Sequence, residues 1–471
     1  MNHPLPLRLL VSIASLLSGF ALPCAIAQTA DADEIRLLRE QIRLLDQKLR
    51  ALEKRQEERE QAAAKTAAAP PAATPKSVTT TAEASGFSIS SADKGYKLAL
   101  KALVQVDHRL FLNEKTVPGT STPIAQNTFL LRRIRPILAG TLGGIFDFSV
   151  VSEMGTGDSP TSSAGLFDAW ISARLSPTMS IKAGKFTSPV ALEAGTSRHF
   201  IEAPFVNAIL PNRDIGVELS GSSGDGLFEY RIGAFNGARN NTSAFARDVD
   251  NDKSIAGRLT LNPFAGGTSA LKSLSIGVGA SVGREEGSAA GTLQAPVTNA
   301  QQTLVSFGSL ISDGEHVRLS PSVSYYSGPT SFVGEYAWTK QQLFRGTTAF
   351  DSKMTAWRAT LGYVLTGEDS TPRGVAPHVN FVPGQSWGAF ELVGRISGIQ
   401  LDDAFFAPGL GALPNVATSA NATGATAFGG GINWFMSRNL TFLLNYEYTD
   451  FDGNTRRPAE SALFSRAQLN F

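Results

Sequence analysis

The segment FLLRRIRPILAG, residues 129–140, places three arginines in a stretch that is otherwise almost entirely apolar. Arginine carries a planar guanidinium group, which binds carboxylate or phosphate oxyanions through two parallel hydrogen bonds. On an extended strand, Arg133 and Arg135 share one face. The other face is apolar and carries Leu130, Ile134, Pro136 and Leu138. The segment is therefore predicted to lie between an apolar environment and an aqueous one. Its arginine-bearing face, on the aqueous side, can attract anions.

Further arginines and lysines lie on the polar face of other alternating segments, or in the loop between two of these segments. The candidate residues for an anion path are Arg133, Arg135, Arg132, Lys185, Arg198, Arg213, Arg231, Arg258, Lys101, Arg109 and Arg358. Overall charge does not favour anions, since Lys and Arg number 42, Asp and Glu number 41, and the two totals are equal after residue 86. Pairing with carboxylates across neighbouring strands is the alternative role of each arginine.

Most of the chain after residue 86 consists of short alternating segments separated by Gly, Pro, Asn, Asp and Ser. In NLTFLLNYEYTDF, residues 439–451, one face is apolar and includes Leu440, Phe442, Leu444, Tyr446 and Tyr448. The other face is polar apart from Leu443. Such segments predict fifteen to seventeen strands, which form either soluble β-sandwiches or one closed barrel.

Three features favour a transmembrane antiparallel barrel over sandwiches. Aromatic residues lie at strand ends on the apolar face, and charge continues along the whole polar face instead of giving way to a core. Short turns such as 175–178 and 436–439 alternate with long loops around 236–252 and 400–425. Within this barrel we expect Arg132, on the lipid side, to lie near an interface where its stem can snorkel.

The first 86 residues divide into three predicted parts. Residues 1–27 have the charged, apolar and small-x-small regions of a secretory signal peptide, and they contain the single cysteine, Cys24. Residues 28–60 are predicted to form a coiled-coil helix, with an a/d seam of Ile35, Leu38, Ile42, Leu45, Leu49 and Leu52. A lone amphipathic helix is the alternative. Residues 61–86 are predicted to be an Ala/Pro/Thr linker.

Several stretches, in order, resemble the phosphate-selective porins of the O/P type, over almost all of residues 87–471. They are LLRRIRPILAGTL, LFDAWISARL with IKAGKFTSPVALE, LPNRDIGVELSG, VRLSPSVSYYSGPTSFVGEYAW, YVLTGE, WGAFELVGRIS, INWFMSRNLTFLLNYEYTDF and SRAQLNF. The resemblance implies a sixteen-stranded outer-membrane barrel, a homotrimer, and an inward-folded constriction loop at about residues 188–212. It also implies an arginine- and lysine-lined anion path, to which the RRIRP positions correspond.

The function expected from these features is a passive channel for small anions such as phosphate or pyrophosphate, in the outer membrane of a Gram-negative bacterium. The alternatives are a general or sugar-admitting porin, and an envelope-tethering protein whose N-terminal stalk contacts peptidoglycan. No enzymatic activity is expected, because GASVG, residues 279–283, lies in a continuous strand and not in the strand-turn-helix of a nucleophile elbow. The expected partners are membrane lipid and further copies of the chain, without nucleic acid, metal or cofactor.

Overall fold

A computed structural model describes residues 30–67, 78–113, 126–155, 165–195, 197–238, 240, 251–285, 293–307, 310–406, 421–453 and 457–471. The chain divides into two units, residues 1–75 and 76–471, which are described separately. The predicted signal peptide, residues 1–27, lies outside the described residues, as do residues 68–77 of the predicted linker.

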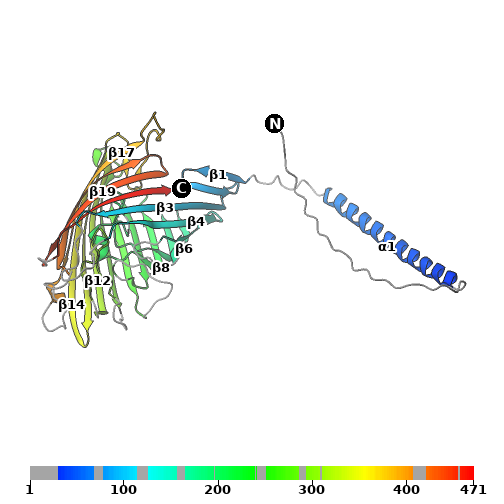
Figure 1. Cartoon of the computed structure of the whole chain (residues 1–471), viewed down its shortest axis with the longest axis horizontal. Coiled ribbons are helices and arrows are strands. Elements are labelled where there is room, and N and C mark those ends of the chain that lie inside the picture. The colour runs from blue at the N-terminus through cyan, green and yellow to red at the C-terminus, as the bar shows by residue number, and fades with distance from the viewer. Residues whose placement is uncertain are drawn as a thin grey trace, which may run out of the picture. The chain divides into compact units, whose positions relative to one another are not determined.

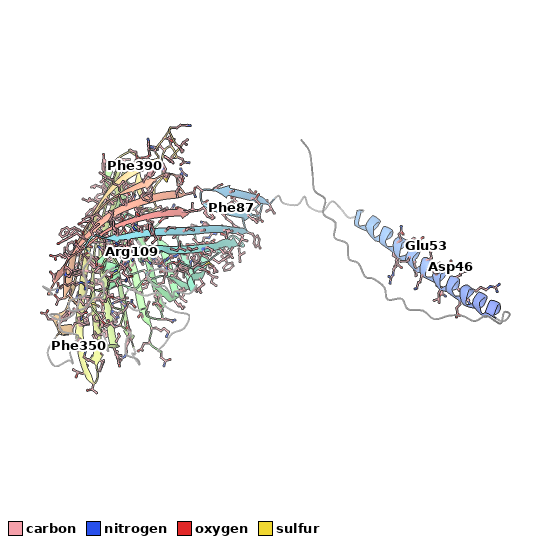
Figure 2. All side chains as sticks on the ribbon, in the orientation of Figure 1. Asp46, Glu53, Phe87, Arg109, Phe350 and Phe390 are labelled. Atoms are coloured by element: carbon pink, nitrogen blue, oxygen red, sulfur yellow. The ribbon has the colours of Figure 1, made fainter. Side chains whose placement is uncertain are left out.

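The N-terminal unit contains one long helix, α1 (Ala30–Ala67). It continues beyond the predicted end at residue 60 because QAAAKTA is rich in alanine, the strongest helix former. Figure 2 shows side chains on the middle part of this helix, where Asp46 and Glu53 are labelled. The described part of the apolar seam is solvent-exposed, at 62% for Ile42, 63% for Leu45, 56% for Leu49 and 64% for Leu52. No described helix is both long enough and apolar enough to span a membrane.

The second unit is a closed, up-and-down antiparallel β-barrel of sixteen strands (Figure 1). Each strand pairs with the next along the chain, and β20 pairs with β3 to close the barrel. The strands are β3 (Lys97–Phe111), β4 (Thr128–Leu142), β5 (Phe146–Glu153), β6 (Gly165–Ser176), β7 (Met179–Thr187), β8 (Arg213–Ser222), β9 (Phe228–Phe235), β10 (Ser254–Leu261), β11 (Leu274–Glu285), β12 (Ile311–Ser327), β13 (Thr330–Arg345), β14 (Thr348–Val364), β17 (Ala389–Leu401), β18 (Gly424–Phe435), β19 (Leu440–Asp452) and β20 (Glu460–Asn470).

A short hairpin of β1 (Thr79–Glu83) and β2 (Gly86–Ser90) precedes the barrel. Strand β1 lies in the region predicted to be linker, and β2 begins at the last residue of that region. Strand β2 pairs with the first four residues of β3, beside the C-terminus (Figure 1). There Phe87 packs edge-to-face on Phe471, with ring centroids 5.8 Å apart. The Thr-rich sequence explains the difference from the prediction, because β-branched residues favour extended pairing.

The predicted alternation of faces is confirmed along most strands. In β19 the aromatic and leucine face is exposed, whereas Thr441, Asn445, Glu447 and Thr449 are buried toward the barrel interior. Strand β11 likewise turns Gly279 and Ser281 inward, within one uninterrupted strand. Strand β19 therefore has the exposed apolar face and the buried polar face that its sequence predicts. Strand β11 runs without a break through GASVG, as expected.

The predicted contrast between a rim of short turns and a rim of long loops has an exception on each rim. The rim that carries turns 177–178 and 436–439 also carries the segment 365–388 between β14 and β17. This segment contains a two-residue ladder, β15 (Ser370–Thr371) with β16 (Gly374–Val375). The long-loop rim, in turn, has only residues 346 and 347 between β13 and β14. Turn length is therefore not uniform on either rim.

The prediction for Arg132 and Leu130 was wrong, because β4 contains a β-bulge. Gln105 of β3 pairs with Arg133, but the next residue, Val106, pairs with Leu131, so Arg132 is an extra residue in β4. A bulge shifts the parity of the residues beyond it. Leu130 consequently pairs with the buried Asp107 on the inner face, and Arg132 forms an ion pair inside the barrel instead of snorkelling to an interface.

The segment 188–212, between β7 and β8, folds into the barrel and includes a 3₁₀ turn at Phe205–Ala208. Its apolar side chains pack against inward-facing alanines of the wall and against other loops. This interior cluster includes Phe205, Val206, Ile209, Leu210, Ala256, Ala337, Ala356, Ala425, Leu304, Val305, Phe307 and Phe405. The expectation of a polar inner face along every strand is thus wrong near the long-loop rim, where burial of apolar surface stabilises an inserted loop.

Candidate functional site

Arginines from opposite walls of the barrel hold the backbone of the segment 188–212, hereafter the inner loop. Arg258 of β10 donates to the carbonyl oxygen of Val190 at 2.9 Å, and Arg133 of β4 donates to that of Gly195 at 3.2 Å. Arg395 of β17 donates to the carbonyl oxygen of Glu202 at 2.8 Å. Such bonds satisfy loop carbonyls that would otherwise be buried without partners. Part of the cationic inner face therefore positions the inner loop.

Ion pairs fasten the same loop through its acidic side chains. Arg358 of β14 lies 2.6 Å from Glu193 of the loop and 3.0 Å from Glu335 of β13, and the Arg358 and Glu335 side chains are at most 1% exposed. Arg198 of the loop lies 2.7 Å from Glu391 of β17. Arg358 and Arg198 therefore pair with carboxylates, which is the alternative role that the sequence left open for each arginine.

A glycine permits the closest approach between the loop and the wall. A Cβ atom at Gly279 of β11 would lie 2.0 Å from the carbonyl oxygen of Val190, a backbone atom. Gly279→Ala is therefore expected to displace the loop, to destabilise the barrel by about 1–3 kcal/mol, and to alter single-channel conductance. The control is Gly394→Ala, because a Cβ atom there meets nothing within 4 Å. Equal conductance and thermal stability in the two variants would contradict this packing.

His199 of the inner loop is fully buried and its Nε2 lies 2.8 Å from the hydroxyl oxygen of Ser331. Burial, followed by the charges of Arg198, Arg358 and Arg395, holds the pKa of His199 well below its usual range. The imidazole is therefore neutral at physiological pH and adds no charge to the lumen.

Two predicted arginines, Arg135 and Arg213, contact the same aromatic ring. The guanidinium carbons of Arg135 and Arg213 lie 3.5 Å and 3.7 Å from the centroid of the Phe167 ring. Arg135 also pairs with Glu153 at 2.6 Å, and Arg213 pairs with Asp168 at 3.0 Å. Cation–π contact and ion pairing together fix both guanidinium groups against the wall.

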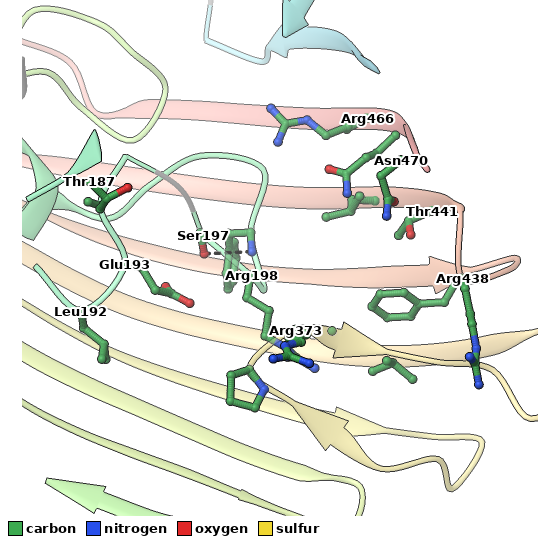
Figure 3. A pocket seen from close by; sticks show the side chains of 18 of the residues that line it. Thr187, Leu192, Glu193, Ser197, Arg198, Arg373, Arg438, Thr441, Arg466 and Asn470 are labelled. Atoms are coloured by element: carbon green, nitrogen blue, oxygen red, sulfur yellow. Dashed lines mark hydrogen bonds between the residues drawn. The ribbon is translucent and has the colours of Figure 1, made fainter. Parts of the chain in front are cut away.

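A cavity of about 500 Å³ lies between the inner loop and the segment 365–388. Figure 3 shows Arg198, Arg373, Arg438 and Arg466 around it, together with Glu193. Its lining contains five arginines, the fifth being Arg213, and a single carboxylate. This cavity brings together two of the sequence-predicted residues, Arg198 and Arg213, in a strongly cationic setting.

The cavity arginines differ in how their charge is compensated. Arg198, Arg213 and Arg466 are each paired with a carboxylate outside the lining: Glu391, Asp168 and Asp107. Arg373 and Arg438 are exposed, and within the described part of the chain neither has a carboxylate at ion-pair distance. Since Glu193 is itself paired with Arg358, two positive charges that no described carboxylate compensates face the cavity.

Sequence reasoning missed Arg373 and Arg438 because both lie outside the long strands. Arg373 is between β15 and β16, and Arg438 is in the turn between β18 and β19. A period-two pattern assigns faces only to strand residues. The available signal was the position of each arginine in a Pro/Gly or Ser/Asn turn, on the rim where the chain ends.

The remaining predicted residues lie apart from the cavity. Arg231 pairs with Glu218 at 2.8 Å, and Arg109 and Arg132 both bind Glu202. Lys185 donates to the carbonyl oxygen of Leu166 at 2.7 Å, while Lys101 is half-buried in β3. The eleven candidates therefore do not form one continuous row.

Comparison with known proteins gives a family and a fold. The model of the family described as phosphate-selective porin O and P matches residues 104–471. An anion-selective porin from Comamonas acidovorans has 12% sequence identity and a TM-score of 0.50, with 80% of this chain and 100% of that chain covered. The outer membrane channel DcaP of Acinetobacter baumannii has 12% identity and a TM-score of 0.50, with coverage of 82% and 100%. No significant match is found among curated proteins.

Proposed function

We propose that this chain selects its solutes at the cavity between the inner loop and the segment 365–388. The chain belongs to the family of phosphate-selective porins O and P and is an anion-selective porin of the Gram-negative outer membrane. The observation that carries the proposal is the excess of five arginines over one carboxylate in the lining. Fixed positive charge in a narrow aqueous path attracts anions and repels cations.

The solutes proposed for this cavity are small inorganic anions such as phosphate and pyrophosphate. Arg373 and Arg438 supply charge that no described carboxylate compensates, so a passing anion interacts with both. Guanidinium groups also suit tetrahedral oxyanions, because their donors match two oxygens at once. Arg198, Arg213 and Arg466 also line the cavity, while their carboxylate partners lie outside the lining.

A general or sugar-admitting porin is the second candidate, and the many Arg–carboxylate pairs on the inner wall favour it. Such pairs produce a local field with little net charge. The reversal potential of the purified mature chain in a KCl gradient separates the two candidates. A chloride permeability well above that of potassium supports the anion path, and one no greater than that of potassium rejects it.

We further propose that α1 joins three copies of the chain as a parallel coiled coil. The exposed seam that includes Leu45 and Leu49 supports this proposal, since burying each leucine contributes about 1.5–3 kcal/mol. Changing both residues to Asp is expected to lower the temperature at which native oligomers dissociate in detergent gels. The control changes Gln47 and Lys54 to Asp, because these positions lie opposite the seam. Equal dissociation temperatures for both double variants would contradict the coiled coil.

The same helix could instead contact the cell wall, as an envelope-tethering protein requires. Deleting residues 30–67, which removes α1 and keeps the β1–β2 hairpin that pairs with β3, distinguishes the two roles. Weakened oligomers with normal envelope integrity indicate an assembly role, and intact oligomers with a leaky envelope indicate tethering.

A further inference from the structure

The segment 365–388, between β14 and β17, carries an apolar patch that consists of Val379, Phe381, Val382 and Trp387. Val379 and Trp387 are 62% and 66% exposed, and Val382 is 39% exposed. Residues 374–390 contain no Asp, Glu, Lys or Arg, so the patch has no charged residue beside it in the sequence. A contiguous exposed apolar patch marks a site of contact with a membrane or with another protein.

Aromatic contacts join this patch to the outer face of the barrel. The ring centroid of Trp434 in β18 lies 5.2 Å from that of Phe381 and 6.2 Å from that of Trp387. The indole N–H of Trp434 also donates to the carbonyl oxygen of Trp387 at 2.6 Å, and its ring stacks on Phe390 of β17 at 5.8 Å. Phe390 and Trp434 alternate with buried residues of their strands, so both belong to the outer face.

The position and chemistry of the patch match the interface between lipid and water. Strand β17 begins and β18 ends at this rim, close to Phe390 and Trp434. Aromatic girdles of membrane barrels lie at this depth, because an indole ring combines an apolar body with a polar N–H. The patch extends the lipid-facing surface past the strand ends without adding charge. Lipid is therefore the partner that this surface fits.

The same segment reaches the cavity through its other half. Arg373 and Val375 line the cavity, and Val375 belongs to a buried apolar cluster that anchors this half to the wall (Figure 3). The backbone N–H of Phe381 donates to the carbonyl oxygen of Met436 at 2.6 Å, two residues before Arg438. The patch is thus connected to both turns whose arginines face the cavity without a described carboxylate partner.

We propose that this patch is immersed in the headgroup region of the surrounding lipid, and that the lipid contact holds the segment 365–388 with Arg373 at the cavity. Ordering a long loop costs conformational entropy, and burial of apolar side chains in the interface offsets that cost. The lipid contact is independent of the proposed function, whereas its effect on selectivity rests on that function.

Spin labels on the mature chain in phosphatidylcholine vesicles test the lipid contact. The one cysteine, Cys24, belongs to the predicted signal peptide, so Val382→Cys, Val379→Cys and Asp225→Cys each provide a single labelling site. Labels at Val382 and Val379 are expected to collide more with oxygen, which concentrates in the bilayer, than with a water-soluble nickel chelate. The control is Asp225, an exposed residue of the turn between β8 and β9 on the same rim, where the reverse is expected. Preference of the patch labels for the nickel chelate overturns the proposal. Low accessibility to both reagents also overturns it, because protein would then cover the patch.

The reversal potential of Trp387→Gln in a KCl gradient tests the effect on the cavity. The ratio of chloride to potassium permeability is expected to fall about threefold, because Arg373 is then held less closely to the path of the anion. Phe264→Gln is the control, since it removes an exposed aromatic side chain from the segment between β10 and β11 on the same rim. Equal ratios in Trp387→Gln and wild type overturn the proposed hold on Arg373. A wild type without anion selectivity overturns the proposed function and not the lipid contact.

Discussion

Replacement of Arg373 and Arg438 by glutamine is expected to lower the ratio of chloride to potassium permeability about tenfold. Both guanidinium groups face the cavity without a described carboxylate at ion-pair distance. Near a protein surface, after screening by salt, each such charge contributes on the order of 1 kcal/mol to an anion a few ångströms away. Both side chains are exposed, so the barrel should fold normally.

The measurement is the reversal potential of the double variant in a KCl gradient. The control changes Lys94 and Lys272 to glutamine, which removes the same charge from exposed positions of the same rim but outside the cavity. If the control shifts selectivity as much as the cavity variant, overall charge and not the cavity determines it.

Arg358→Gln is expected to destabilise the barrel by about 3–5 kcal/mol, the largest stability change anticipated for any one side chain here. It would leave the carboxylates of Glu193 and Glu335 without their shared cation, and the Glu335 side chain is completely buried. An unpaired buried charge loses hydration without gaining a partner. Since Glu193 belongs to the inner loop, the same change should also loosen that loop.

Thermal stability in detergent, followed by the mobility shift of the folded band, tests this expectation. Arg174→Gln provides the control, because its pair with Asp147 is 51% and 32% exposed. Such surface pairs contribute about 0–1 kcal/mol. Similar losses of stability in the two variants would show that the Arg358 pairs are weak.

The architecture and the family were predictable from sequence. Each strand has a period of two, and its apolar side must face lipid, so β19 and β11 have the faces that their residue types indicate. The resemblance to the phosphate-selective porins is confirmed by the match over residues 104–471, and the barrel has the sixteen strands it implies.

The details of the site were less predictable, because they depend on departures from that period. One extra residue in β4 reverses the faces of Arg132 and Leu130, and no sequence pattern marks its position. The inner loop contacts strands that are far apart in the sequence, among them β3, β10, β18 and β20. These contacts depend on the path of the loop through the barrel, which a residue pattern does not give. Arg373 and Arg438 enter the site from turns, where alternation carries no information.

Crystals of the protein grown or soaked in bromide would test the central claim most directly, by locating a permeating anion through its anomalous scattering. Bromide density is predicted in the cavity, about 3–4 Å from the guanidinium groups of Arg373 or Arg438. Bromide bound elsewhere in the lumen, with none in this cavity, would contradict the claim that anions are selected there.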